Sequence, residues 1–214
     1  MDQTPTEQPD HFLQRIEALR TALHQSDPDR MARQTGTNLL WKNGEGAYHF
    51  ALWDRPVRLQ LPEMKVYEAD SEKLLPPPLQ ALCLFYFTTA DGAPVGEGWV
   101  SFSELPDGRF YNQAYQGYSG GELRRAFGDD LAAFSRAAER NNGEPFPARG
   151  AETPGDLAYR FRVLPRVHLL VAAWEGDEDF SSSYQILFDA SVSHYLPTDV
   201  CAIAGGMLAK RLIR

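Results

Sequence analysis

Apolar and polar residues alternate through much of the first third of the chain, and this alternation predicts a β meander. Residues 48–53 and 57–61 place apolar side chains on one face and polar side chains on the other, as half-buried strands do. Asn43-Gly44 precedes the first of these segments, and this pair favours the positive φ angles of a two-residue hairpin turn. Residues 39–41 and 64–67 complete a predicted meander of three or four strands.

A helical period of apolar residues flanks this meander on both sides. Residues 10–24 carry an apolar stripe, with Asp10 as the predicted N-cap. Asp27-Pro28 is a favourable start for a second, short helix that ends near Gly36. Residues 79–89 are apolar on nearly every side, which predicts a buried central helix.

The second half of the chain mixes both periods. Helical spacing from residue 110 to residue 140 predicts two or three helices, and Thr198 is the predicted cap of a last helix that runs to about Leu212. Residues 181–189 fit either a strand or a short helix, and a serine that can serve as N-cap favours the helix. The predicted strands of this half are residues 96–102, 157–163 and 167–174.

These elements predict an α+β fold. N-terminal helices and a mostly antiparallel meander sheet are expected to pack against the buried central helix, with further helices toward the C-terminus. Residues 1–9 are polar and interrupted by proline, so we expect a disordered tail there. Residues 10–214 are expected to form a single domain.

Composition and charge narrow the class of partner. The chain has 214 residues, of which 43% are hydrophobic, and a net charge of −8. Binding to nucleic acid and to anionic membranes depends on clustered Lys and Arg, so neither partner is expected. Residues 1–10 do not resemble a signal peptide, and the longest apolar runs are too short to span a membrane, so a cytoplasmic protein is predicted. Cys83 and Cys201 have no C-x-x-C neighbour, and reduced, partly buried thiols are expected rather than zinc or iron–sulfur ligands.

The densest charge lies at residues 174–180, between two apolar segments. Hard cations such as Mg²⁺ and Ca²⁺ prefer carboxylate ligands, so one hypothesis is a divalent cation bound by Asp177 and Asp179. The spacing of the acids does not fit a calcium-binding loop. No other cofactor is expected. The candidate site consists of Glu104, Trp174, Asp177, Glu178, Asp179 and Asp189.

Structural interpretations of these acids stay open beside the chemical one. The acidic stretch can form a solvated turn whose acids cap the following helix and face its positive N-terminal end, or its acids can pair with Arg160, Arg162 or Arg166. Glu104 follows a predicted apolar strand, where a half-buried carboxyl with a raised pKa can act as a general acid or base. A helix cap or an ion-pair partner is the alternative at that position.

Several segments together resemble one family. Residues 98–108, GWVSFSELPDG, are similar to the pattern G-x-W-[IV]-S-F-x-E-L-x-G-G. Residues 164–180 resemble a P-x-P-[LI]…W-x-G-D-E-E-F segment, and residues 186–199 resemble an I-L-F-D…YLP-[TE]-[ED] ending. Their order and spacing identify the chain as similar to the bacterial and archaeal family of the domain of unknown function 3786. The sequence departs from the family pattern at Asn141-Asn142-Gly143 and at Asp179.

The resemblance implies a setting without implying an activity. Some members of the family carry an added cysteine-rich iron–sulfur module, which this chain lacks. Our leading hypothesis is therefore a non-enzymatic accessory module that binds a ligand or a protein partner, in connection with redox or metallocofactor systems. The alternative is a divalent-cation-dependent hydrolase or transferase that uses Asp177, Asp179, Asp189 and Glu104. The sequence leaves open whether the protein is a monomer or a homodimer.

Overall fold

The computed structural model of the chain describes residues 8–146 and 153–214. Residues 1–7 of the predicted tail lie outside this part. The first helix, α1, spans Gln8–His24. Because it begins at Gln8, the prediction of Asp10 as its N-cap is wrong, and Asp10 lies inside the helix.

The predicted meander is present as a four-stranded antiparallel sheet whose strands follow one another in chain order. Asn43 and Gly44 form the first turn, with φ angles of 54° and 84°. The left-handed conformation that the Asn-Gly pair favours is therefore the one that the hairpin uses. The strands are β1 (Asn38–Lys42), β2 (Glu45–Leu52), β3 (Arg55–Gln60) and β4 (Lys65–Glu68).

A second antiparallel sheet has five strands in the order β5-β9-β8-β7-β6. The helix predicted at residues 181–189 is wrong, because this segment forms β9 and pairs with both β5 and β8. A central strand that is buried on both faces loses the alternation that marks a strand in the sequence. Ser182 does not cap a helix; its hydroxyl accepts the backbone N–H of Gly176. The strands are β5 (Trp99–Ser101), β6 (Glu144–Phe146), β7 (Leu157–Leu164), β8 (Val167–Trp174) and β9 (Ser183–Asp189).

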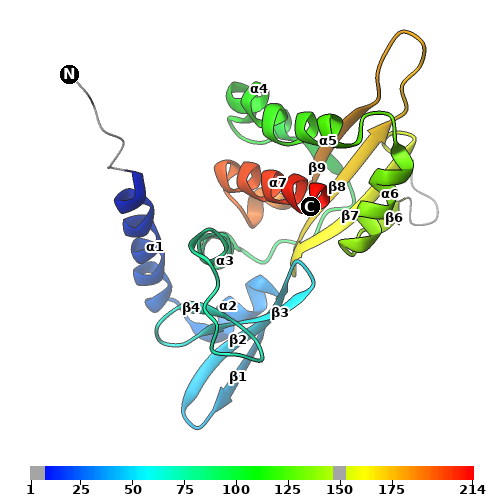
Figure 1. The fold of residues 1–214 in the computed structure, drawn as a ribbon. Helices are drawn as coiled ribbons and strands as arrows, with labels where there is room; N and C mark the ends of the chain where they lie inside the picture. Colours follow the sequence, from blue (N-terminus) through cyan, green and yellow to red (C-terminus); the bar gives the residue numbers. More distant parts are fainter. Residues whose placement is uncertain (1–7, 147–152) are drawn as a thin grey trace.

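Helices cover the two sheets and connect them (Figure 1). Asp27 caps α2 as predicted, since its Oδ1 accepts the N–H of Arg30 over 2.6 Å. The Thr198 cap is wrong: Pro197 is the N-cap of the last helix, and the Thr198 hydroxyl donates to the carbonyl of Pro106. The remaining helices are α2 (Pro28–Thr35), α3 (Pro77–Thr89), α4 (Gly108–Tyr118), α5 (Gly120–Phe127), α6 (Leu131–Arg140), α7 (Thr198–Ile213) and the 3₁₀ turns η1 (Phe102–Glu104) and η2 (Val192–His194).

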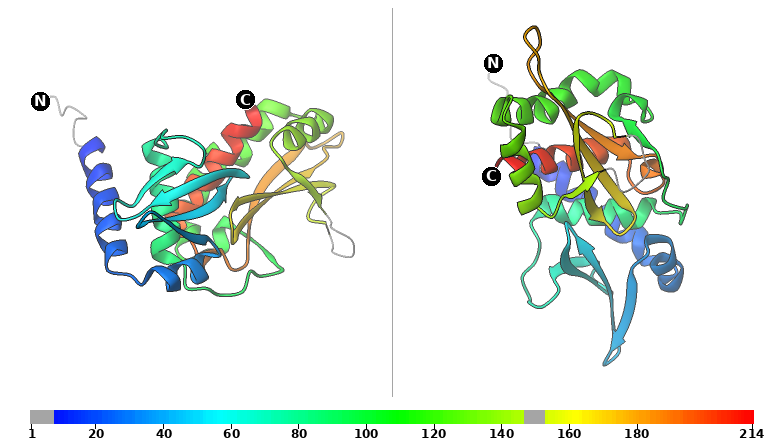
Figure 2. Two further views of the ribbon diagram at one scale, coloured as in Figure 1. Left: turned by 90° about the horizontal axis from the view of Figure 1, so that it is seen from below. Right: turned by 90° about the vertical axis from the view of Figure 1, so that its right-hand side faces the viewer.

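The apolar helix α3 is central, as its sequence predicts. It lies between the meander sheet and α7. Figure 1 shows α3 end-on, and the right-hand view of Figure 2 shows it from the side. Its one buried polar side chain is Gln80, whose amide accepts the N–H of Val66 and donates to the carbonyl of Val66 on edge strand β4, both over 2.9 Å. These bonds satisfy backbone groups that a buried sheet edge would otherwise leave unpaired.

The two sheets meet at the end of β2. The backbone N–H of Trp53 donates to the carbonyl of Val163 on β7 over 2.9 Å. The Arg162 guanidinium pairs beside it with the Asp54 carboxylate, at 2.8 Å. One hydrophobic cluster includes buried side chains of both sheets and of the helices between them, so the turn at Trp53-Asp54 lies at the junction of the whole fold.

Candidate ligand-binding pocket

The acidic stretch forms the tip of the β8–β9 hairpin. Asp177 Oδ1 accepts the backbone N–H groups of Asp179 and Phe180, over 2.9 and 2.8 Å. The N–H of Asp177 in turn donates to the carbonyl of Phe180. Glu178 and Asp179 are exposed. The solvated turn is therefore confirmed. The prediction that its acids cap a helix is wrong, because the segment that follows is strand β9.

The neighbouring arginines have partners elsewhere. Arg160 pairs with Glu144, and Arg162 pairs with Asp54. The Arg166 guanidinium donates to the backbone carbonyl of Arg33 over 3.3 Å. Within the described residues the acidic turn forms no ion pair with these arginines. The second structural interpretation, an ion pair with one of them, is therefore wrong.

Asp189 and Trp174 are components of the second sheet. Asp189 is 2% exposed at the end of β9, and its Oδ2 accepts the N–H of His168 over 2.9 Å. Its Oδ1 accepts the N–H and the hydroxyl of Ser191. Trp174 is half-buried at the end of β8 and packs against a small cluster of apolar side chains on this sheet. Both residues have structural contacts that account for their position.

Glu104 caps a 3₁₀ turn. Its Oε2 accepts the backbone N–H and the hydroxyl of Ser101, both over 2.7 Å, in a capping box. These hydrogen bonds lower the pKa of Glu104, because they favour the charged carboxylate. The prediction of a half-buried carboxyl with a raised pKa is therefore wrong at this position.

The described residues contain no group of three or more His, Cys, Asp or Glu side chains placed to hold a metal ion. The cation predicted at Asp177 and Asp179 thus has no supporting donor set there. Cys83 on α3 and Cys201 on α7 are both fully buried, and burial raises the pKa of each thiol. Thiolates are the form that ligates iron or zinc, so these two residues do not fit a metal cluster.

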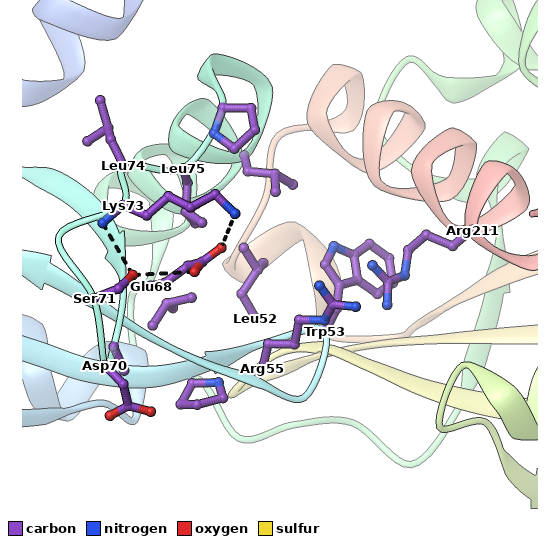
Figure 3. Close-up of a pocket in the computed structure, with 15 residues that line it drawn as sticks. Leu52, Trp53, Arg55, Glu68, Asp70, Ser71, Lys73, Leu74, Leu75 and Arg211 are labelled. Carbon is purple, nitrogen blue, oxygen red and sulfur yellow. Dashed lines mark hydrogen bonds and ion pairs between the residues drawn. The ribbon is translucent and has the colours of Figure 1, made fainter.

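A pocket of about 560 Å³ lies elsewhere, between the meander sheet, the start of α3 and the last turn of α7 (Figure 3). Its size is within the range of small-molecule sites. Apolar side chains form most of its wall, among them Leu52, Val57, Leu75 and Leu79. None of the candidate residues predicted from the sequence lines it.

Trp53 lines this pocket in an unusual backbone conformation. Trp53 and Asp54 form the two-residue turn between β2 and β3, with φ angles of 52° and 58°. Positive φ is rare for a bulky side chain and is a strained choice when no glycine is used. Trp53 is only 6% exposed. The strained turn therefore holds the indole ring at the pocket wall, in contact with the core.

Two guanidinium groups lie beside this ring. The Arg211 guanidinium carbon is 5.1 Å from the centroid of the Trp53 ring, within the range of a cation–π contact. Figure 3 shows the guanidinium of Arg55 on the same side of the pocket. Burial, followed by repulsion from Arg55, lowers the pKa of Arg211. Within the described residues neither arginine forms an ion pair.

The opposite wall of the pocket is mixed in charge. Lys73 Nζ pairs with Glu68 Oε1 at 2.7 Å, and the Ser71 hydroxyl donates to the other oxygen of Glu68. Asp70 lies at the rim (Figure 3). This side offers neutralised or acidic acceptors, whereas the side of Trp53 offers two cations. The pocket is therefore polar at both ends and apolar between them.

Sequence reasoning missed this site because its parts are far apart in the chain. Arg55 follows β2, whereas Arg211 lies in the last turn of α7. A cation near a helix C-terminus is ordinarily explained by the helix dipole. The one local signal was the break in apolar alternation after Trp53, where no glycine or asparagine provides the turn.

The fold and the pocket define an α+β protein with two antiparallel sheets and an amphipathic, ligand-sized pocket between the meander sheet, α3 and α7. Residues 27–211 match the family described as domain of unknown function (DUF3786), and the chain belongs to this family, as its motifs predicted. Comparison with curated proteins and with solved structures gave no match. Within the described residues, no helix is long and apolar enough to cross a membrane.

Proposed function

We propose that this chain is a cytoplasmic, non-enzymatic binding module, and that the pocket beside Trp53 takes a small organic anion with an aromatic or apolar body. The observation that carries the proposal is the pair Arg55 and Arg211, two cations that form no ion pair within the described residues, at the edge of an apolar pocket.

Electrostatics favours an anion at this end of the pocket. The charged form of Arg211 is disfavoured by burial and by the nearby charges of Arg55 and Arg214, and the Asp54 carboxylate opposes this only in part. An anionic group between the two guanidinium groups would offset both effects and could accept paired hydrogen bonds from a planar fork. A carboxylate or a phosphate monoester has the charge and the geometry for this contact.

The apolar part of the pocket favours a ligand whose uncharged portion is flat and apolar. Leu52, Val57 and Leu79 offer apolar surface next to the indole of Trp53. A flat apolar group would bury area there, and each Å² of apolar area removed from water contributes on the order of 25 cal/mol. At the far end Lys73 neutralises Glu68, and the carboxylate of Asp70 suits a hydrogen-bond donor rather than a second negative charge.

Isothermal titration calorimetry with phenyl phosphate and with benzoate tests the proposal, with benzyl alcohol as the uncharged probe. We expect saturable binding of at least one anion, weakened about tenfold or more in Arg211→Gln, since a charge-assisted hydrogen bond contributes about 1.5–3 kcal/mol. Arg140→Gln on α6 removes the same charge from an exposed site and is the matched control. Equal binding of the uncharged probe, or unchanged affinity in Arg211→Gln, would overturn the proposal.

The hydrolase or transferase hypothesis lacks a comparable observation. Asp177, Asp189 and Glu104 each accept hydrogen bonds within separate structural motifs. The connection to redox or metallocofactor partners rests on the family resemblance alone. Pull-down from an extract of a native host tests it, and recovery of no redox protein or cofactor would count against it.

A further inference from the structure

A second hollow lies between α4 and α7, at the opposite end of α7 from the pocket beside Trp53. It has a volume of about 470 Å³ and is bounded by Pro106 and Asp107 at the start of α4 and by Asp199 at the start of α7. Small side chains face it from both helices, Ala114 from α4 and Ala202 from α7. The space exists because neither helix places a large side chain at these positions.

Close helix packing fixes the far end of this groove. A Cβ on Gly206 of α7 would lie 3.1 Å from the ring of Tyr118, so the glycine lets the ring rest directly against the helix. Tyr118 also packs edge-on against the buried ring of Tyr115, with centroids 5.7 Å apart. The Tyr118 ring is thereby held as one wall of the groove while 42% of the residue stays exposed.

The walls of the groove are aromatic. Tyr111 and Tyr118 lie about one and about three helical turns along α4 from Asp107, and Phe102 of η1 also lines the groove. Tyr111 is 66% exposed, although a large aromatic side chain on a helix could bury its ring against a neighbour. Aromatic faces carry a negative electrostatic potential and attract cations.

The charges of the groove are negative. Asp107 and Asp199 line it, and no Lys, Arg or His does. Asp107 occupies the N-cap position of α4 with φ at 58°, but its side chain makes no capping hydrogen bond. In the described residues Asp107 has no ion-pair partner either. Asp199 pairs at 2.9 Å with Arg15, at a site where both side chains are about half exposed, and such exposed pairs contribute little.

We propose that the groove between α4 and α7 is a binding site for a small organic ammonium ion. The ammonium group would lie between Asp107 and Asp199, and its apolar body would lie against Tyr111 and Tyr118. Carboxylates combined with aromatic faces recognise an alkylated or arylated ammonium by charge and by cation–π attraction. This site is independent of the anion pocket and does not rest on the function proposed for it.

Calorimetry with phenethylammonium tests this site, with 2-phenylethanol as the uncharged probe of the same shape. The variant is Asp107→Asn, because asparagine tolerates the left-handed conformation as aspartate does and only the charge is removed. Glu178→Gln at the β8–β9 tip removes one exposed charge elsewhere and is the matched control. Arg211→Gln alters the anion pocket only, so it shows whether the ammonium probe binds at a different site.

We expect saturable binding of phenethylammonium that weakens at least fivefold in Asp107→Asn and stays unchanged in Glu178→Gln and Arg211→Gln. Tyr111→Ala, at a largely exposed position, should weaken the same probe without lowering the melting temperature. The proposal is overturned if phenethylammonium does not saturate up to its solubility, if 2-phenylethanol binds equally well, or if Asp107→Asn binds like the wild type.

Discussion

The backbone N–H of His168 on β8 donates over 2.9 Å to Oδ2 of Asp189 at the end of β9. The other oxygen of this carboxylate accepts the backbone N–H of Ser191 over 3.1 Å and its hydroxyl as well. A carboxylate with 2% exposure is therefore an acceptor for three donors. Asp189 joins the second sheet to the η2 turn that follows it, which is a structural role.

Asp189→Asn should destabilise the protein. The amide that replaces one oxygen has only donors, so it cannot accept from a backbone N–H, and an unsatisfied buried group costs about 1–3 kcal/mol. Urea denaturation measures the loss in the free energy of unfolding. Asp179→Asn, on the exposed turn, is the control and should differ little from the wild type. Equal midpoints for both variants would contradict the assignment.

His168 should make stability depend on pH. Burial mainly lowers the pKa of its imidazole, and Arg160 and Arg162 add to this, while Asp189 and Glu144 oppose it. In the unfolded chain a histidine titrates near about 6.5. As the pH falls below that value, the unfolded state takes up the proton first, so the stability contribution present at higher pH is lost.

Urea denaturation at several pH values between about 7.5 and 5 measures this loss, because the contribution falls away below the histidine's ordinary pKa. His168→Gln should have a shallower decline than the wild type. His24→Gln, at an exposed position, should keep the decline of the wild type. A wild-type slope that persists in His168→Gln would show that another group causes it.

Gly205, the first of two adjacent glycines in α7, should not tolerate a side chain. A Cβ on Gly205 would come within 2.3 Å of the Tyr115 hydroxyl oxygen and 2.9 Å of its ring. Gly205→Ala should therefore destabilise by about 1–3 kcal/mol through overpacking. Gly117→Ala on α4 meets nothing within 4 Å and should leave stability unchanged or raise it by up to about 1 kcal/mol. Thermal unfolding compares the two, and a stable Gly205→Ala protein would contradict the close packing.

Titration with Mg²⁺ and Ca²⁺ tests the cation hypothesis for the acidic turn. Asp177 Oδ1 already accepts two backbone N–H groups, and Glu178 and Asp179 are exposed around it. A metal would have to compete with these hydrogen bonds, so we expect no saturable heat. Saturable heat that disappears in Asp177→Asn would restore the cation site.

Local signals in the sequence were sufficient for most of the fold. The Asn43-Gly44 turn and the Asp27 cap depend on backbone preferences of a few adjacent residues, and both are present. The apolar run at residues 79–89 marked α3 as central because no face of it is polar. Residues 181–189 were misassigned because pairing with strands on both sides, a nonlocal contact, decides their conformation.

The sequence pointed to the acidic residues as a candidate site and gave no sign of either pocket. Dense charge at residues 174–180 drew attention, yet hydrogen bonds within the turn account for Asp177. The pocket beside Trp53 combines β3 with the end of α7, and the groove combines the start of α4 with the start of α7. No motif or spacing in the sequence predicts which of these distant elements lie together, because tertiary packing decides it.

Helix α7 is shared by both sites. Asp199 is at its first turn and Arg211 at its last, and its 16 residues span about 24 Å. Both sites contact this one helix, so binding at one end changes affinity at the other only if the ligand displaces α7. Linkage is reciprocal, so the factor by which an anion changes ammonium affinity must equal the factor by which ammonium changes anion affinity. Titrating each probe with the other at saturation gives both factors, and a shared factor different from one would make α7 the coupling element of an allosteric protein.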